Sequence, residues 1–201
     1  MLDVTRTTTM LLEGLGQPDD DAAWTTVDRR YRPIVTGMAR RLGLTDADAA
    51  DVAQETMVRV LGEYRDGRYD RERGRLRTWI LAIARTKIAD IHRKRGVRKE
   101  ARGESAILTT PTEAEMEDLW ATERRMVILR AALADLQATS NLSARSIQAF
   151  EMLVFHERTV EETSEALDMS ANDVYLARSR ITKKLREVVE QLESVYDEDG
   201  P

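Results

Sequence analysis

The spacing of apolar residues constrains the fold of this 201-residue chain more strongly than any other feature. Apolar side chains recur at steps of three and four residues, and strict alternation over the length of a strand is hard to find, so the pattern indicates amphipathic helices. Four prolines, at positions 18, 33, 111 and 201, leave long stretches uninterrupted. The sequence therefore predicts an all-α protein.

The predicted helices fall into two groups, which indicates two small helical domains. A stretch at 96–120 separates the groups; it loses the periodicity and contains Gly96, Gly103 and Pro111, so we expect an extended, flexible linker there. Residues 1–23 are expected to form a flexible N-terminal extension, and residues 196–201 an acidic tail. The expected helices lie at 24–42 (interrupted or kinked near Pro33), 45–64 and 76–95 in the first domain (24–95), and at 122–136, 144–156, 160–167 and 171–195 in the second (121–195).

The charge is distributed unevenly along the chain. The net charge is −5, but residues 24–100 alone carry 19 Lys and Arg against 11 Asp and Glu, a balance of +8. The balance is −9 over residues 101–201 and −4 over residues 1–23, which together account for the total. A polyanion is therefore a plausible partner of the first domain despite the acidic total.

The composition also bears on the compartment. The chain has no cysteine, so disulfides and thiolate metal sites are excluded and a reducing compartment costs the fold nothing. Residues 1–17 have neither the basic start nor the long apolar core of a signal peptide, and no apolar run approaches the length of about 20 residues that crosses a bilayer. We expect a cytoplasmic protein without a membrane segment.

The predicted helix at 45–64 carries an acidic face. Thr45 is a suitable N-cap with Asp48 at the third helical position, and a turn of about 100° per residue places Asp48, Asp51 and Glu55 in one polar sector flanked by Gln54. One interpretation is a solvated face whose acids favour the positive end of the helix dipole. The other is a docking strip for a basic partner.

A basic segment follows the acidic helix. The glycine-containing stretch Arg65–Gly74 is predicted to be a loop, and it combines Arg68, Arg71 and Arg73 with Tyr69, an aromatic side chain able to stack on an unpaired base. The helix after it adds further cations. Although a solvated basic face is the alternative, the density of cations favours a nucleic-acid surface.

The C-terminal part of the sequence predicts a helix-turn-helix. Thr159 and Glu162 form a capping-box pattern, and Ser170 can cap the next helix with Asp173 at its third position. Two short helices joined by about three residues match the motif, although helical hairpins without DNA are common. The residues expected to face outward on the second helix are Tyr175, Leu176, Ser179, Arg180 and Lys183, with Arg178 at the edge of the apolar stripe.

Enzymatic function is poorly supported by the sequence. It contains no glycine-rich phosphate loop and no Gly-x-Ser-x-Gly motif, and its two histidines, His92 and His156, lack the spacing of metal ligands. An enzyme acting on nucleic acid would need acids arranged around a metal. Asp48, Asp51 and Glu55 are candidates, but they lie on one exposed helix without a visible partner. We therefore expect no catalytic residue, no metal and no cofactor.

Read together, these segments resemble a known family. The ordered set Trp24, Tyr31-Arg-Pro33, Asp48-x-x-Asp51-x-x-Gln54-Glu55, Tyr69-Asp70, Gly74-Arg-Leu-Arg-Thr-Trp79 and Arg93-Lys-Arg95 resembles region 2 of bacterial extracytoplasmic-function (ECF) sigma factors of the sigma-70 family. The helix-turn-helix is similar to their region 4. The resemblance covers about 24–95 and 122–192, and it implies a sigma factor that binds core RNA polymerase and directs promoter recognition, melting and transcription initiation.

The resemblance also implies roles for individual residues. It assigns polymerase binding to Asp48, Asp51, Gln54 and Glu55; binding of the minus-10 promoter element to Arg68, Tyr69, Arg71, Arg73, Arg75, Arg77, Trp79, Arg85 and Thr86; and binding of the minus-35 element to Asn172, Tyr175, Leu176, Arg178, Ser179, Arg180 and Lys183. The linker would thread the polymerase cleft. Whether an anti-sigma factor is a further partner stays open.

The sequence departs from the family pattern at four positions. Ala50 stands where an acid is common, Thr86 where Asn is common and Arg178 where Leu is customary. Asp168 replaces the usual Gly of the turn, and Asp enters the left-handed region more readily than most residues. The rival interpretation is a helix-turn-helix regulator that acts without polymerase, which would leave the acidic face and the arginine-rich loop unused.

Overall fold

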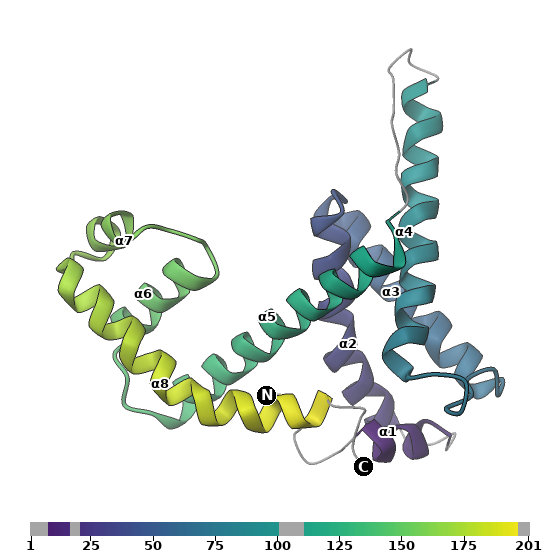
Figure 1. Ribbon diagram of the computed structural model, residues 1–201, viewed down its shortest axis with the longest axis horizontal. Helices are drawn as coiled ribbons and strands as arrows, with labels where there is room; N and C mark the ends of the chain where they lie inside the picture. The colour runs from purple at the N-terminus through teal and green to yellow at the C-terminus, as the bar shows by residue number, and fades with distance from the viewer. Residues whose placement is uncertain (1–7, 17–20, 101–110, 197–201) are drawn as a thin grey trace. The chain divides into compact units, whose positions relative to one another are not determined.

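The protein is all-α, as predicted. The computed structural model describes residues 8–16, 21–100 and 111–196, and these contain eight α-helices and no strand (Figure 1). The helices are α1 (Thr8–Leu15), α2 (Asp21–Arg41), α3 (Asp46–Arg65), α4 (Leu76–Glu100), α5 (Glu113–Thr139), α6 (Ala144–Val154), α7 (Val160–Leu167) and α8 (Ala171–Tyr196). No helix in the described ranges is both long and apolar enough to cross a membrane.

The chain divides into two compact units within α5. The N-terminal unit ends at Val127, and the C-terminal unit runs Ile128–Ser194. In the N-terminal unit α3 contacts both α2 and α4. The contacts are made by side chains that the helical period brings to one face of each helix, among them Ile34 and Met38 of α2, Val52 and Met57 of α3 and Ile80 of α4, all essentially inaccessible to solvent. Pro33 lies inside α2 without ending it.

The prediction of a flexible N-terminal extension is wrong for the described part of that segment. Residues 8–15 form α1, whose Leu11, Leu12 and Leu15 are buried and which contacts α2 and α3. The leucines occupy one face of a helix of only two turns, too short for periodicity to mark it in the sequence. Its stability comes from burial against the longer helices.

Both flanks of the expected linker are helical where the structure describes them. Helix α4 continues to Glu100, and α5 begins at Glu113, where Thr112 and Glu115 cap it reciprocally: the Glu115 amide donates to Thr112 Oγ1 (3.2 Å) and Glu115 Oε2 accepts from the Thr112 amide (2.7 Å). Only residues 101–110 of that stretch lie outside the described residues.

The first half of α5 belongs to the N-terminal unit. Trp120 is 2% exposed and its ring stacks on that of Tyr31 in α2, with centroids 5.9 Å apart. Glu123 is buried, forms an ion pair with Arg41, and lies so close to Gly37 that a Cβ there would collide with its carboxylate. A side chain at position 37 would therefore force the Glu123 carboxylate to move.

The C-terminal unit contains the predicted helix-turn-helix. Helix α7 contacts α6, and the capping box of Thr159 and Glu162 is present. Asp168 ends α7 in the left-handed conformation (φ 49°), as its place in the turn required. The inner stripe predicted for the last helix is confirmed, since its five members are buried: Val174, Ala177, Ile181, Leu185 and Leu192.

Candidate functional site

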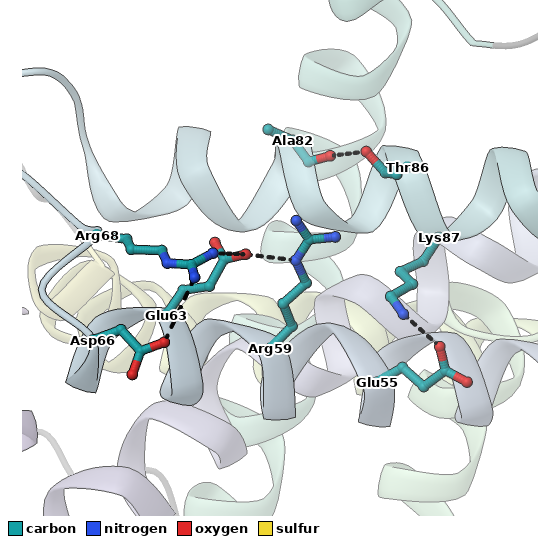
Figure 2. A network of polar contacts seen from close by, with 8 residues as sticks. All are labelled: Glu55, Arg59, Glu63, Asp66, Arg68, Ala82, Thr86 and Lys87. Carbon is teal, nitrogen blue, oxygen red and sulfur yellow. Dashed lines mark hydrogen bonds and ion pairs between the residues drawn. The ribbon is translucent and has the colours of Figure 1, made fainter.

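The acidic face of α3 is present, and two of its three acids are engaged by bases of α4. Thr45 caps the helix by accepting the Asp48 amide, and the Asp48 carboxylate forms an ion pair with Arg95. Glu55 accepts a hydrogen bond from Lys87 Nζ at 2.7 Å (Figure 2). Asp51 and Gln54 are exposed. The four residues therefore differ in how readily a partner can reach them.

The ion pair with Lys87 changes the acidity of Glu55. The hydrogen bond from Lys87 and the charge of that ammonium lower the pKa of the Glu55 carboxyl, with a smaller contribution from the charge of Lys94. The direction of this shift favours the ionised carboxylate.

The acidic face borders a surface hollow that sequence reasoning did not identify. The hollow, about 550 Å³, is lined by Asp51, Gln54, Glu55, Val58, Arg59 and Lys87. Val58 is the one aliphatic residue among these lining residues, and it is 60% exposed. The sequence spacing could have placed Val58 on this face, because it follows Asp51, Gln54 and Glu55 by seven, four and three residues.

The loop between α3 and α4 is ordered by backbone hydrogen bonds. We call residues 66–75 the arginine loop. Gly67 adopts a positive φ of 70°, and the Arg68 amide donates to the Glu63 carbonyl at 2.9 Å, so the chain turns as α3 ends. A second turn follows, in which the Arg73 amide donates to the Asp70 carbonyl at 3.1 Å. The arginine loop therefore has a defined backbone conformation with two turns.

The arginines of the loop remain largely accessible. Arg68 Nη1 lies 3.9 Å from Glu63, and its Nη2 lies 3.9 Å from Asp66, so both contacts are long (Figure 2). Glu63 is shared with Arg59, whose Nε donates to it at 2.7 Å. Arg71 and Arg73 are exposed. These cations can reach a polyanion with little loss of internal contacts.

Tyr69 is engaged by two other aromatic rings. Its ring stacks on Tyr64 of α3 (5.7 Å between centroids) and packs at a tilt against Trp79 of α4 (5.0 Å), and its hydroxyl donates to the Gly74 carbonyl at 3.2 Å. We call Tyr64, Tyr69 and Trp79 the aromatic ladder. Tyr69 and Trp79 are each half-buried, so the ladder presents an aromatic edge at the surface that carries the loop cations.

The remaining predicted minus-10 residues lie at or along α4. Arg75 is exposed at its start, and Arg77 is half-buried in its first turn. Further along the helix Arg85 is half-buried and Thr86 exposed, and the Thr86 hydroxyl donates to the Ala82 carbonyl at 3.0 Å (Figure 2). That bond occupies the hydroxyl hydrogen but leaves the oxygen able to accept.

The predicted recognition face of α8 is open to solvent. The Ser170 hydroxyl accepts the Asp173 amide at 3.1 Å, which caps the helix as expected. Tyr175 and Leu176 are large apolar side chains left exposed, at 55% and 40%. All seven predicted residues are exposed: Asn172, Tyr175, Leu176, Arg178, Ser179, Arg180 and Lys183.

A basic residue outside this set lies beside the start of α8. A hollow of about 330 Å³ brings Arg145, in the first turn of α6, together with Ser170, Leu176 and Arg180. The pairing of α6 with the start of α8 depends on the tertiary fold, so the sequence offered no signal beyond a lone arginine after the Ser143 cap.

No three His, Asp or Glu side chains among the described residues come together as a metal site would require. Two of the acids considered for such a site, Asp48 and Glu55, pair with Arg95 and Lys87 instead.

The described fold and surfaces define an all-helical protein with an acidic face and an arginine loop on neighbouring parts of one unit. Residues 27–98 match the family model of sigma-70 region 2, a stretch that begins in α2, contains α3 and the arginine loop, and ends in α4. None of the curated proteins matches the chain. The match supports a sigma factor of the sigma-70 family, with a role in RNA polymerase binding and promoter recognition.

Proposed function

We propose that this chain is a sigma factor of the ECF class, which docks on core RNA polymerase and directs it to promoters through both of its units. The observation that carries the proposal is the region 2 match, because the matched stretch contains both the acidic face of α3 and the arginine loop. Sigma-70 family members are not enzymes, so the polymerase supplies the chemistry and this chain supplies recognition. The role places it in the cytoplasm.

In this proposal polymerase docks on the α3 face formed by Asp48, Asp51, Gln54 and Glu55. Asp51, Gln54 and Glu55 are exposed and Asp48 is half-buried. Asp51 and Gln54 can bind the partner directly, whereas Asp48 and Glu55 exchange their contacts with Arg95 and Lys87. Val58 adds an apolar contact at the rim of the hollow. A basic and partly apolar partner surface suits this combination.

The arginine loop and α4 take the minus-10 element in the same proposal. Arg68, Arg71 and Arg73 neutralise phosphates of a separated strand, and the half-buried rings of Tyr69 and Trp79 offer aromatic surface against which an exposed base can pack. The minus-10 set proposed here is the one predicted from the sequence: Arg68, Tyr69, Arg71, Arg73, Arg75, Arg77, Trp79, Arg85 and Thr86.

The C-terminal unit reads the minus-35 element through α8. Its exposed face combines Arg180 and Lys183, suited to phosphates and guanine, with the polar and apolar side chains of Asn172, Ser179 and Leu176. Arg145 adds a cation beside the start of the recognition helix. The helix-turn-helix geometry supports this part of the proposal.

The second candidate is a regulator that binds DNA through α7 and α8 without polymerase. It accounts for the C-terminal unit and leaves the surfaces within residues 27–98 without a role, so the family match favours the sigma factor.

Transcription in vitro from a library of genomic fragments separates the two candidates. With core polymerase, the sigma factor initiates transcription at a small set of fragments that core polymerase alone does not use. A regulator of the second kind binds fragments without core polymerase and starts no transcripts, and that result would overturn the proposal.

A further inference from the structure

Helix α1 is integrated into the N-terminal unit although it lies outside the family match, which starts at residue 27. Leu11 is fully buried and Leu15 is 2% exposed. Burial of two leucines on a helix of eight residues fixes that helix firmly against α2 and α3. Helix α1 is therefore part of the packed N-terminal unit.

One hydrogen bond joins α1 to the end of α3. The Tyr64 hydroxyl donates to the Leu12 carbonyl at 2.5 Å. Leu12 belongs to the last turn of α1, whose carbonyls generally lack a partner within their own helix. Burial raises the pKa of Tyr64, and the charge of Glu13 raises it further, so the hydroxyl stays protonated and able to donate.

The aromatic ladder continues from this bond into the arginine loop. The Tyr64 ring stacks on Tyr69, and Tyr69 in turn packs at a tilt against Trp79. Tyr69 is the only loop residue in the ladder, and its hydroxyl binds the Gly74 carbonyl near the other end of the loop. A chain of contacts thus runs from α1 through Tyr64 to the segment that carries Arg68, Arg71 and Arg73.

We propose that α1 is a positioning element for the arginine loop, acting through the hydroxyl of Tyr64. The bond to Leu12 fixes the orientation of the Tyr64 ring, the ring fixes Tyr69, and Tyr69 holds the loop in the conformation that presents its arginines. A loop ordered before it binds loses less conformational entropy when DNA engages it. Tyr64 and Leu12 are therefore positioning residues that need not touch DNA.

Hydrogen exchange of the free, full-length protein tests the coupling. Tyr64→Phe removes one hydroxyl and keeps the stacked ring. The exchange rates of the loop amides, including those of Arg68 and Arg73, should rise about two- to tenfold, the factor expected when one hydrogen bond that stabilises the closed loop is lost. Thr25→Val is the matched control, because it removes an exposed hydroxyl of α2 that binds the Asp21 carbonyl and is not part of the ladder.

Three outcomes of the exchange experiment bear on the proposal. Faster exchange in the loop, with amides of α6 to α8 unchanged, supports it. Unchanged loop exchange in Tyr64→Phe, or the same change in Thr25→Val, overturns it. A double variant with Leu11→Ala adds a further test: if α1 acts through the Tyr64 hydroxyl, Tyr64→Phe should accelerate loop exchange little further once α1 has been loosened.

The functional consequence rests on the proposed function and is measured separately. In the assembled polymerase complex, Tyr64→Phe should lower the yield of opened promoter while leaving the affinity for closed promoter DNA unchanged, a split that general destabilisation would not produce. Equal loss of both would overturn the positioning role. If the wild type itself opens no promoter, the sigma assignment fails, whereas the exchange result still decides the coupling of α1 to the loop.

Discussion

At the scale of single residues, Asp51 differs from the other acids on its face of α3. Asp48 is paired with Arg95 and Glu55 with Lys87, whereas Asp51 is exposed and makes no ion pair with any residue the structure describes. A partner can therefore bind Asp51 without displacing an internal base. A substitution at this position tests docking with the least disturbance of the fold.

We expect Asp51→Lys to weaken binding to core polymerase by about three- to tenfold, since an exposed charge pair contributes modestly and reversal converts attraction into repulsion. The loss should be largest at low salt, where screening is weakest. Titration of fluorescent protein with core polymerase at two salt concentrations measures it. Asp118→Lys, the same change at an exposed position of α5, is the control, and equal affinities for the two variants would refute the role of Asp51.

The ion pair between Glu55 and Lys87 should make the stability of the protein depend on pH. Because Lys87 lowers the pKa of Glu55 in the folded protein, the ion pair adds stability above the ordinary carboxyl value of 4.5, and that stability is lost as the pH falls through the lower folded value. An NMR titration should place the Glu55 midpoint below 4.5, and Lys87→Met should move it upward. A midpoint that does not respond to Lys87→Met would show that the pair is not formed in solution.

At the scale of elements, the caps of the helix-turn-helix determine where α8 begins. Ser170 accepts the Asp173 amide and its hydroxyl donates to the Asp173 carboxylate at 2.7 Å. Asp168, in the left-handed conformation, turns the chain just before this cap. These short-range features set the direction in which α8 leaves the turn.

Ser170→Ala should lower the free energy of unfolding of the C-terminal unit by about 1 kcal/mol, the usual cost of losing an N-cap. Urea unfolding followed by circular dichroism measures the loss. Ser194→Ala, which removes an exposed hydroxyl bound to the Gln191 carbonyl near the end of α8, should change stability much less. Comparable losses in the two variants would indicate that Ser170 does not cap α8.

Short-range features such as these were the part of the structure that the sequence could predict. The caps at Thr45, Thr159 and Ser170 each depend on residues three positions apart, so they can be recognised from a pattern. The inner stripe of α8 follows likewise from the helical period. The exposed arginines of the loop were predictable because turn residues and charges mark a solvated segment.

Contacts between distant residues were not predictable. The pairs Glu55–Lys87 and Arg41–Glu123 join residues 32 and 82 positions apart, and no local pattern links them. The packing of Tyr69 against Tyr64 and Trp79 depends on how the loop turns, so the sequence identified Tyr69 as an aromatic near cations but not as part of a ladder. Helix α1 could not be predicted, because its leucines are buried only by contacts with α2 and α3.

At the scale of the whole molecule, the N-terminal unit is larger than the stretch that matches sigma-70 region 2. It includes α1 before the match and the first half of α5 after it. The buried Trp120 and Glu123 bind the beginning of α5 to Tyr31 and Arg41 of α2. The first half of α5 is therefore held against α2 by these two contacts.

Trp120→Ala should destabilise the N-terminal unit by about 3 kcal/mol, because it removes a large buried ring and leaves a cavity beside Tyr31. Trp120→Phe keeps a ring at the site and should cost about half as much or less. Chemical unfolding followed by circular dichroism compares the two. Wild-type stability of Trp120→Ala would mean that α5 does not contact α2 in solution.

In the proposed function, promoter melting joins polymerase docking to the arginine loop, so permanganate footprinting of a promoter selected in the transcription screen tests the central claim most directly. With wild-type protein and core polymerase together, thymines in the minus-10 element should become reactive, and neither component alone should expose them. Asp51→Lys should reduce the reactivity at limiting protein concentration by weakening docking. A protein that binds the same fragment but leaves every thymine unreactive in the presence of core polymerase would contradict the account.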